Sequence, residues 1–198
     1  MVTFSAQFLA GASRFAECPP GGTPEVAFVG RSNAGKSSML NRLTGSKRLA
    51  RVSKTPGRTR MLNFFDIEGG GRFVDLPGYG YANASKSARR LWSQAIDDYL
   101  TRRADLAAIV LVMDARHPLQ PFDRQMLDWA QSTGTPMLAV LNKCDKLKQG
   151  ARNLAQRRVA AHVASMANVD VLTFSARTGL GAEALARRVG EFLGRAED

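Results

Sequence analysis

The stretch GRSNAGKS restricts the fold of this chain more than any other part of the sequence. Its Gly30, Gly35, Lys36 and Ser37 fit the pattern G-x-x-x-x-G-K-[S/T], which links a strand to a helix and wraps around nucleotide phosphates. The apolar run EVAFVG precedes the loop, and SSMLNRL follows it with apolar residues at helical spacing. The glycines let the backbone curl closely around an anion, and the helix presents its positive dipole end. The sequence therefore predicts a nucleotide-binding α/β unit.

Short β-rich runs and longer helical patterns alternate along the rest of the chain. Strands are expected at residues 25–30, 106–115, 136–143 and 169–176, a hairpin over 61–78 around Gly69-Gly70-Gly71, and helices after the phosphate loop and at 85–103, 121–132, 151–166 and 181–193. Strands spaced by such helices form βαβ crossovers. The predicted fold is therefore α/β, of the three-layer P-loop type: a mostly parallel six-stranded sheet with one antiparallel edge strand and helices on both faces.

The size of the chain suits one domain. With 198 residues and 44% hydrophobic residues it can bury a continuous core. We expect residues 24–194 to form this domain, residues 1–23 to be an extension that packs on it, and residues 195–198 to be a short tail. No apolar run reaches the roughly 20 residues that span a bilayer, and the first residues lack a signal-peptide pattern. Cys18 and Cys144 lie far apart without metal-ligand spacing, so we expect reduced thiols and a cytoplasmic protein.

The sequence NKCD bears on which base is bound. It closes a predicted strand, so it lies at the carboxyl edge, where ligands of parallel sheets bind. The carboxylate of Asp145 can accept two hydrogen bonds from the N1–H and 2-amino groups of guanine, a donor pair that adenine lacks. Asn142 would brace this loop, and the stem of Lys143 would lie along the base. FSA ends the next strand, where the backbone at Ser175 and Ala176 is a candidate donor to the guanine carbonyl. The predicted nucleotide is GTP, not ATP.

Two more segments are typical of a nucleotide-controlled switch. In DLPG, Asp75 is expected to hold Mg²⁺ through water and the Gly78 N–H to sense the γ-phosphate, while the Ser37 hydroxyl is the usual direct ligand of Mg²⁺. Upstream, SKTPGRTR carries two threonines, one of which would bind Mg²⁺ only while the γ-phosphate is present. Thr59, just ahead of a strand, is the preferred candidate, and Thr55 is the alternative.

The residue after DLPG bears on hydrolysis. It is Tyr79, whereas in the best-studied GTPases a glutamine there orients the attacking water. We therefore expect slow hydrolysis or another device. Lys36 and Thr59 are the predicted catalytic residues. Asn33 is a third candidate, because a polar group beside the phosphates can help hold a monovalent cation such as K⁺; the alternative is that it only stabilises the loop.

Together these elements resemble the EngB (YihA or YsxC) family of bacterial ribosome-biogenesis GTP-binding proteins, a single-domain branch of the Era-like P-loop GTPases. The resemblance runs from about residue 5 to 193, through PEVAFVGRSNAGKSS, KTPGRTR, DLPGYGYA, NKCD and FSA. It implies GTP or GDP with Mg²⁺ held by Ser37 and Thr59. The nucleotide contacts that it implies are Gly30, Arg31, Ser32, Asn33, Ala34, Gly35, Lys36, Ser37, Gly57, Arg58, Thr59, Arg60, Met61, Asp75, Leu76, Pro77, Gly78, Asn142, Lys143, Cys144, Asp145, Phe174, Ser175 and Ala176. Arg60 stands where relatives usually carry glutamine.

The resemblance also implies a role in assembly of the large ribosomal subunit, with a link to cell division and septation. The charge agrees with an RNA-containing partner, since the chain has 28 Lys and Arg but 17 Asp and Glu, a formal net charge of +11. A merely solvated basic surface would carry the same charge. Arginine pairs recur on predicted helices at Arg89-Arg90, Arg102-Arg103, Arg157-Arg158 and Arg187-Arg188. We expect a monomer that contacts the rRNA and proteins of a subunit precursor through this basic surface.

Two alternatives from other classes stay open at the level of sequence. A phosphotransferase acting on a small molecule would use the same phosphate loop, but the chain shows no recognisable acceptor domain or lid, and NKCD favours a switch. A nucleotide-independent RNA-binding protein with a vestigial site would explain the charge alone. His117 and His162 lack partners at metal-ligand spacing and are interpreted as structural.

Overall fold

The structure of the protein, a computed structural model, describes residues 3–46, 49, 61–79 and 86–195, with the backbone alone for residues 86–93. Within these residues one sheet has the strand order β1-β3-β4-β2-β5-β6-β7. The strands are β1 (Ala6–Ala12), β2 (Glu25–Gly30), β3 (Leu62–Ile67), β4 (Arg72–Asp75), β5 (Leu106–Asp114), β6 (Met137–Asn142) and β7 (Val169–Thr173). The five strands from β4 to β7 are parallel, and the pairs β1–β3 and β3–β4 are antiparallel. Every residue of β2 and β6 is buried, as expected for central strands of a parallel sheet.

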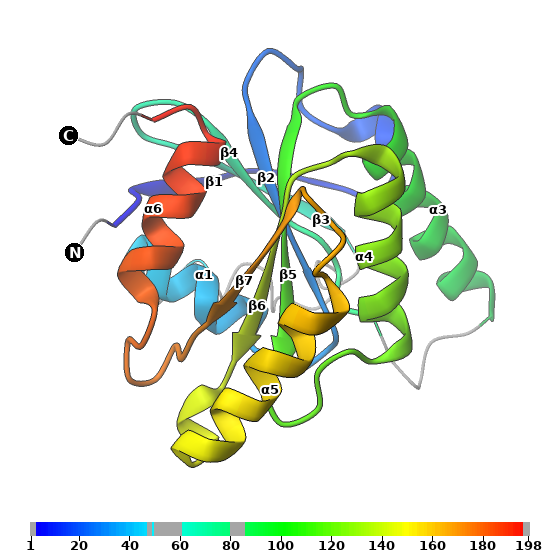
Figure 1. The fold of residues 1–198 in the computed structure, drawn as a ribbon. Helices are drawn as coiled ribbons and strands as arrows, with labels where there is room; N and C mark the ends of the chain where they lie inside the picture. Colours follow the sequence, from blue (N-terminus) through cyan, green and yellow to red (C-terminus); the bar gives the residue numbers. More distant parts are fainter. Residues whose placement is uncertain (1–2, 47–48, 50–60, 80–85, 196–198) are drawn as a thin grey trace.

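Helices cover both faces of the sheet (Figure 1). They are α1 (Lys36–Thr44), α3 (Lys86–Arg102), α4 (Pro121–Thr133), α5 (Gln149–His162) and α6 (Ala182–Phe192), with short 3₁₀ turns η1 (Phe15–Glu17) and η3 (Cys144–Lys146). Residues of α1 and α6 share one core cluster with the sheet, and residues of α3, α4 and α5 share the other. The sheet therefore separates two cores, and the predicted three-layer α/β fold class is confirmed.

The sheet has seven described strands, one more than predicted, because the N-terminal extension contributes β1. Ala6 pairs with Ile67 and Ala12 with Leu62, with an irregularity between Phe8 and Ala10. The sequence AQFLAGA gave no strand signal, since alanine and glycine are weak strand formers and only the partner edge makes the pairing favourable. Just before β1, Phe4 is buried and its ring meets that of Phe73 edge to face, 5.2 Å between centroids.

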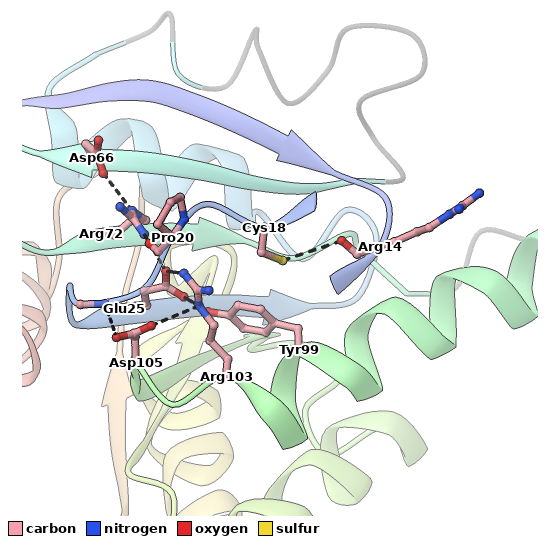
Figure 2. Close-up of polar contacts among 10 residues, drawn as sticks. Arg14, Cys18, Pro20, Glu25, Asp66, Arg72, Tyr99, Arg103 and Asp105 are labelled. Atoms are coloured by element: carbon pink, nitrogen blue, oxygen red, sulfur yellow. Dashed lines mark hydrogen bonds and ion pairs between the residues drawn. The ribbon is translucent and has the colours of Figure 1, made fainter. Parts of the chain in front are cut away.

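A buried charge cluster ties β2 to α3 at the edge of the sheet where β2 begins (Figure 2). Glu25 is fully buried; it accepts hydrogen bonds from Arg72 Nη1 at 3.0 Å, Arg103 Nη2 at 2.6 Å and the Tyr99 hydroxyl at 2.8 Å. Tyr99 and Arg103 lie at the carboxyl end of α3, so this cluster fixes that end of the helix to the start of the strand that leads into the phosphate loop.

Among the described residues, no helix is both long and apolar enough to cross a membrane.

Candidate functional site

The phosphate loop joins β2 to α1 at the edge of the sheet where the parallel strands end, and its two glycines stand where the backbone passes close to other groups. A Cβ on Gly30 would lie 2.5 Å from the carbonyl oxygen of Val112 on β5. Gly35 precedes the helix with φ +98°, and a Cβ there would overlap the side-chain amide of Asn142. Neither position admits a side chain without displacing its neighbour.

The cation of the loop meets the carboxylate of DLPG. Lys36 begins α1, and its Nζ forms an ion pair with Asp75 Oδ1 at the end of β4. The two side chains are only 10% and 3% exposed, so the pair is shielded from solvent. Ser37, the next residue of α1, is half-buried in the same first turn. The predicted phosphate and Mg²⁺ groups therefore share one corner of the sheet edge.

DLPG runs alongside the phosphate loop. The Ser32 N–H donates to the Tyr79 carbonyl oxygen at 2.8 Å, and a Cβ on Gly78 would lie 3.3 Å from the Ser32 backbone. The Leu76 N–H donates to the Phe28 carbonyl at 3.0 Å, and the Leu76 side chain is buried in the core. Leu76 therefore offers only its backbone to the edge, while Gly78 lies directly against the loop.

The NKCD segment is connected to the phosphate loop by two side chains. Asn142 Nδ2 donates to the Ala34 carbonyl oxygen at 2.9 Å, and Lys143 Nζ donates to the Asn33 carbonyl oxygen. Asn142 Oδ1 in turn accepts from the Lys143 N–H at 2.7 Å. Cys144, by contrast, buries its side chain, with Sγ 3.1 Å from the Leu141 carbonyl oxygen. The end of β6 and the phosphate loop thus form one connected unit.

Asp145 is held at the rim of a pocket. Its Oδ1 accepts from the Ser175 hydroxyl at 2.7 Å and its Oδ2 from Arg177 Nε at 2.8 Å, which together lower the pKa of Asp145 below its ordinary value. A carboxylate has about four acceptor sites, so two stay available for a ligand. The pocket measures about 330 Å³, and its lining includes Gly35, Asn142 and Asp145. Small-molecule sites have volumes of this order.

The remaining predicted nucleotide contacts differ in how they are buried and in how they reach the site. Met61 precedes β3, in which Asn63 pairs with Asp75, so it lies at the same edge of the sheet. Phe174 is buried in the core and reaches the site through its backbone, where its carbonyl oxygen accepts from the Cys144 N–H at 3.1 Å. Arg31 and Asn33 are exposed, the latter with φ +66°. Ala34 is buried, and Pro77 follows Leu76 in DLPG. Thr55 and the contacts Gly57, Arg58, Thr59 and Arg60 lie outside the described residues.

Two residues that the sequence interpretation missed belong to this edge. Asp114 ends β5, and its Oδ2 accepts from Lys143 Nζ at 3.0 Å and Arg116 Nη2 at 2.7 Å. Burial works in the opposite direction, but these hydrogen bonds hold the pKa of Asp114 well below its usual range. A polar residue closing a strand was a usable signal for Asp114. Arg177, next to FSA, carried no such signal, because its pairing with Asp145 arises only in the folded chain.

The donor set fits Mg²⁺. The Ser37 hydroxyl and the Asp75 carboxylate supply the hard oxygen ligands that this ion prefers. Within the described residues, no group of three or more His, Cys, Asp or Glu is arranged to hold a metal ion. The fit therefore depends on these two oxygen donors together with phosphate oxygens, which is how Mg²⁺ is usually bound beside nucleotides.

Sequence comparisons relate the chain to GTP-binding proteins. The family model described as "50S ribosome-binding GTPase" matches residues 25–143, and one described as "Elongation factor Tu GTP binding domain" matches residues 97–194. The "Probable GTP-binding protein EngB" of Nitrosococcus oceani is 47% identical over 192 residues, which cover 96% of this chain and 95% of that protein. Its counterpart in Thiobacillus denitrificans is 46% identical over 188 residues, covering 95% and 91%.

Solved structures agree on the fold. The crystal structure of a probable GTP-binding protein engB aligns with a TM-score of 0.70 at 24% identity and covers 86% of this chain and 98% of that one. Aquifex aeolicus Era bound to GDP.AlF4⁻ aligns with a TM-score of 0.64 at 23% identity, over 87% of this chain and 57% of that one.

Proposed function

The chain belongs to the EngB family of GTP-binding proteins and is a GTPase, and from this premise we propose that it is a slow GTP-dependent switch in assembly of the large ribosomal subunit. The observation that carries the switch is the connection of three motifs at one edge. Asn142 joins the base-reading segment to the phosphate loop, and Lys36 joins that loop to DLPG. A nucleotide seated there would contact all three together.

We propose that the guanine base lies in the pocket beside Asp145. The carboxylate is nearly buried, with 6% of its side chain exposed, and its lowered pKa keeps it an ionised acceptor. Two of its acceptor sites would take the N1–H and 2-amino donors of guanine. Lys143 lines the same pocket, and its bonds to Asn33 and Asp114 hold its stem in one orientation.

We propose that Lys36 and the first turn of α1 bind the phosphates, and that Ser37, Asp75 through water, and Thr59 hold Mg²⁺. When bound, Mg²⁺ neutralises charge on the β- and γ-phosphates. Lys36 and the N–H groups of the first turn would supply positive charge and hydrogen-bond donors to the same phosphates. We further propose that Asn33 helps to hold K⁺ beside the phosphates. This cation would supply positive charge at a site that lacks the glutamine used by other GTPases.

The proposed partner is a precursor of the large ribosomal subunit, and α5 is the part of the described surface that fits it best. Arg157 and Arg158 are exposed on this helix, which contains no acidic residue. Among the described residues neither forms an ion pair, whereas Arg188 on α6 is paired with both Asp170 and Glu191. Unpaired arginines attract RNA phosphates. The matching family, described as "50S ribosome-binding GTPase", supports the same partner.

Sedimentation of cell lysate tests this partner. The protein should move with large-subunit particles in a manner that depends on whether GDP or a non-hydrolysable GTP analogue is added, and less so at high salt. The double variant R157Q/R158Q should weaken this association severalfold. The matched control R187Q/R188Q removes the same formal charge from α6 and should leave it nearly unchanged. Failure to sediment with any ribosomal particle, or equal effects of the two double variants, would contradict the proposal.

The resemblance also supports proposing a cytoplasmic location and a link to cell division and septation. A defect in division that appears only after subunit assembly fails would place the division role downstream of the ribosome. A division defect with normal ribosome profiles would contradict this order.

A further inference from the structure

Tyr79, the residue directly after DLPG, is held by three contacts. Its carbonyl oxygen accepts the Ser32 N–H of the phosphate loop at 2.8 Å. Its ring stacks on Phe122 of α4, with 3.7 Å between centroids and 26° between planes. Its hydroxyl donates to Asp123 Oδ1, also on α4. One residue therefore connects the phosphate loop, DLPG and the start of α4.

Asp123 is itself fixed. Only 2% of the residue is exposed, and its second oxygen accepts the Gln120 N–H at 2.8 Å as part of the capping box of α4. The carboxylate therefore cannot turn away from Tyr79 without breaking the cap. Burial, followed by the bond to Asp123, raises the pKa of Tyr79, so the hydroxyl stays protonated and remains the donor.

These contacts assign the hydroxyl of Tyr79 to α4. A glutamine in this position of other GTPases orients water with its side chain. Here the side chain packs on Phe122 and bonds to Asp123, while the backbone of Tyr79 pairs with the phosphate loop at Arg31 and Ser32. The backbone of Gly78 and Tyr79 therefore gives α4 a direct connection to the phosphate loop.

We propose that Tyr79 and Asp123 are positioning residues that hold Gly78 against Ser32, with the Gly78 N–H prepared for the γ-phosphate. This rests on the proposed role of Gly78 as the γ-phosphate sensor. Because GDP lacks that phosphate, the pair favours GTP over GDP and has little effect on the affinity for GDP. A loop held in its bound conformation loses less entropy on binding, which is the source of the gain.

The test compares the dissociation constants of GDP and a non-hydrolysable GTP analogue, measured by titration calorimetry. Tyr79→Phe keeps the ring stack and removes only the hydroxyl. It should weaken the GTP analogue about three- to tenfold, the range of one hydrogen bond, and change GDP by less than about twofold. Asp123→Asn keeps an acceptor for Tyr79 and should have a smaller effect on this ratio than Asp123→Ala.

The matched control is Tyr99→Phe, which removes the same hydroxyl from another buried tyrosine–carboxylate bond, that with Glu25, at the opposite edge of the sheet (Figure 2). It should lower thermal stability and leave the ratio of the two affinities unchanged. The proposal is overturned if Tyr79→Phe weakens both nucleotides equally, leaves the ratio unchanged, or matches Tyr99→Phe. If the unmodified protein binds neither nucleotide, the proposed function itself fails, which is a different result.

Discussion

Asp145, the proposed acceptor for guanine, is held by two hydrogen bonds. The Ser175 hydroxyl and the Arg177 guanidinium donate to it from the segment after β7, so this side chain joins the segments that follow β6 and β7. Both hydrogen bonds favour the ionised form, and the pKa of Asp145 lies below its ordinary value. Since the acid is ionised above that pKa, the proposed acceptor for guanine stays ionised through neutral pH and loses its charge only as the pH falls into the acid range.

Burial makes both cysteine thiols weaker acids. Burial raises the pKa of Cys18 to about 11, and burial likewise raises the pKa of Cys144. Because the thiolate is the reactive form, Cys18 should react with iodoacetamide at pH 8 at least about tenfold more slowly than an ordinary cysteine, whose pKa is about 8.5, and Cys144 should also react more slowly. Mass spectrometry of the native and the urea-unfolded protein measures this. Rapid labelling of Cys18 in the native protein would show that the segment around it does not shield the thiol.

The sequence predicted those candidate site residues that belong to short, continuous motifs. GKS, DLPG and NKCD each follow a strand, so the sequence alone places them at one edge of a parallel sheet. The contacts of Tyr79 with Asp123 and of Arg177 with Asp145 join residues 44 and 32 positions apart. No local pattern encodes such pairs, since they depend on how the helices pack.

At the scale of elements, the two edges of the sheet have different roles. One edge gathers the phosphate loop and the segments after β4, β6 and β7. The other holds the Glu25 cluster, through which Arg72 of β4 and Arg103 after α3 meet β2 (Figure 2). Strand β1 contributes to neither group of residues and was not predicted. Its small side chains give little indication of a strand in the sequence, and its pairing with β3 stabilises it as one.

Removing the acid at the centre of the second edge should be costly. Glu25→Ala removes the buried carboxylate between Arg72 and Arg103, which keep only their pairs with the more exposed Asp66 and Asp105 among the described residues. Loss of one partner of a buried ion pair costs up to about 3–5 kcal/mol. The matched control is Asp98→Ala, which breaks the exposed pair with Arg102 and should cost under about 1 kcal/mol. Urea unfolding measures both. Similar free energies of unfolding for the two variants would contradict the role of the cluster.

At the scale of the whole molecule, one chain connects a nucleotide edge to a basic exterior. The fold class follows from the alternation of strands and helices. The relatives show that the chain belongs to a GTP-binding family. The α5 helix, which carries the proposed ribosomal surface further along, begins just after the turn that contains Asp145 and the proposed base pocket. The connection of the two through one helix would give a physical route by which nucleotide binding and the proposed particle binding affect each other.

The proposed recognition of guanine by Asp145 can be measured by calorimetric titration of GDP, IDP, ADP and XDP into the unmodified protein and Asp145→Asn. IDP lacks the 2-amino donor, ADP lacks both donors, and XDP carries a carbonyl in place of the amino group. The unmodified protein should bind GDP most tightly, IDP less tightly and ADP weakest, by about 100-fold or more. Asp145→Asn, which presents an amide donor, should prefer XDP to GDP. Equal affinity of the unmodified protein for ADP and GDP, or an unchanged preference for GDP in Asp145→Asn, would contradict the account.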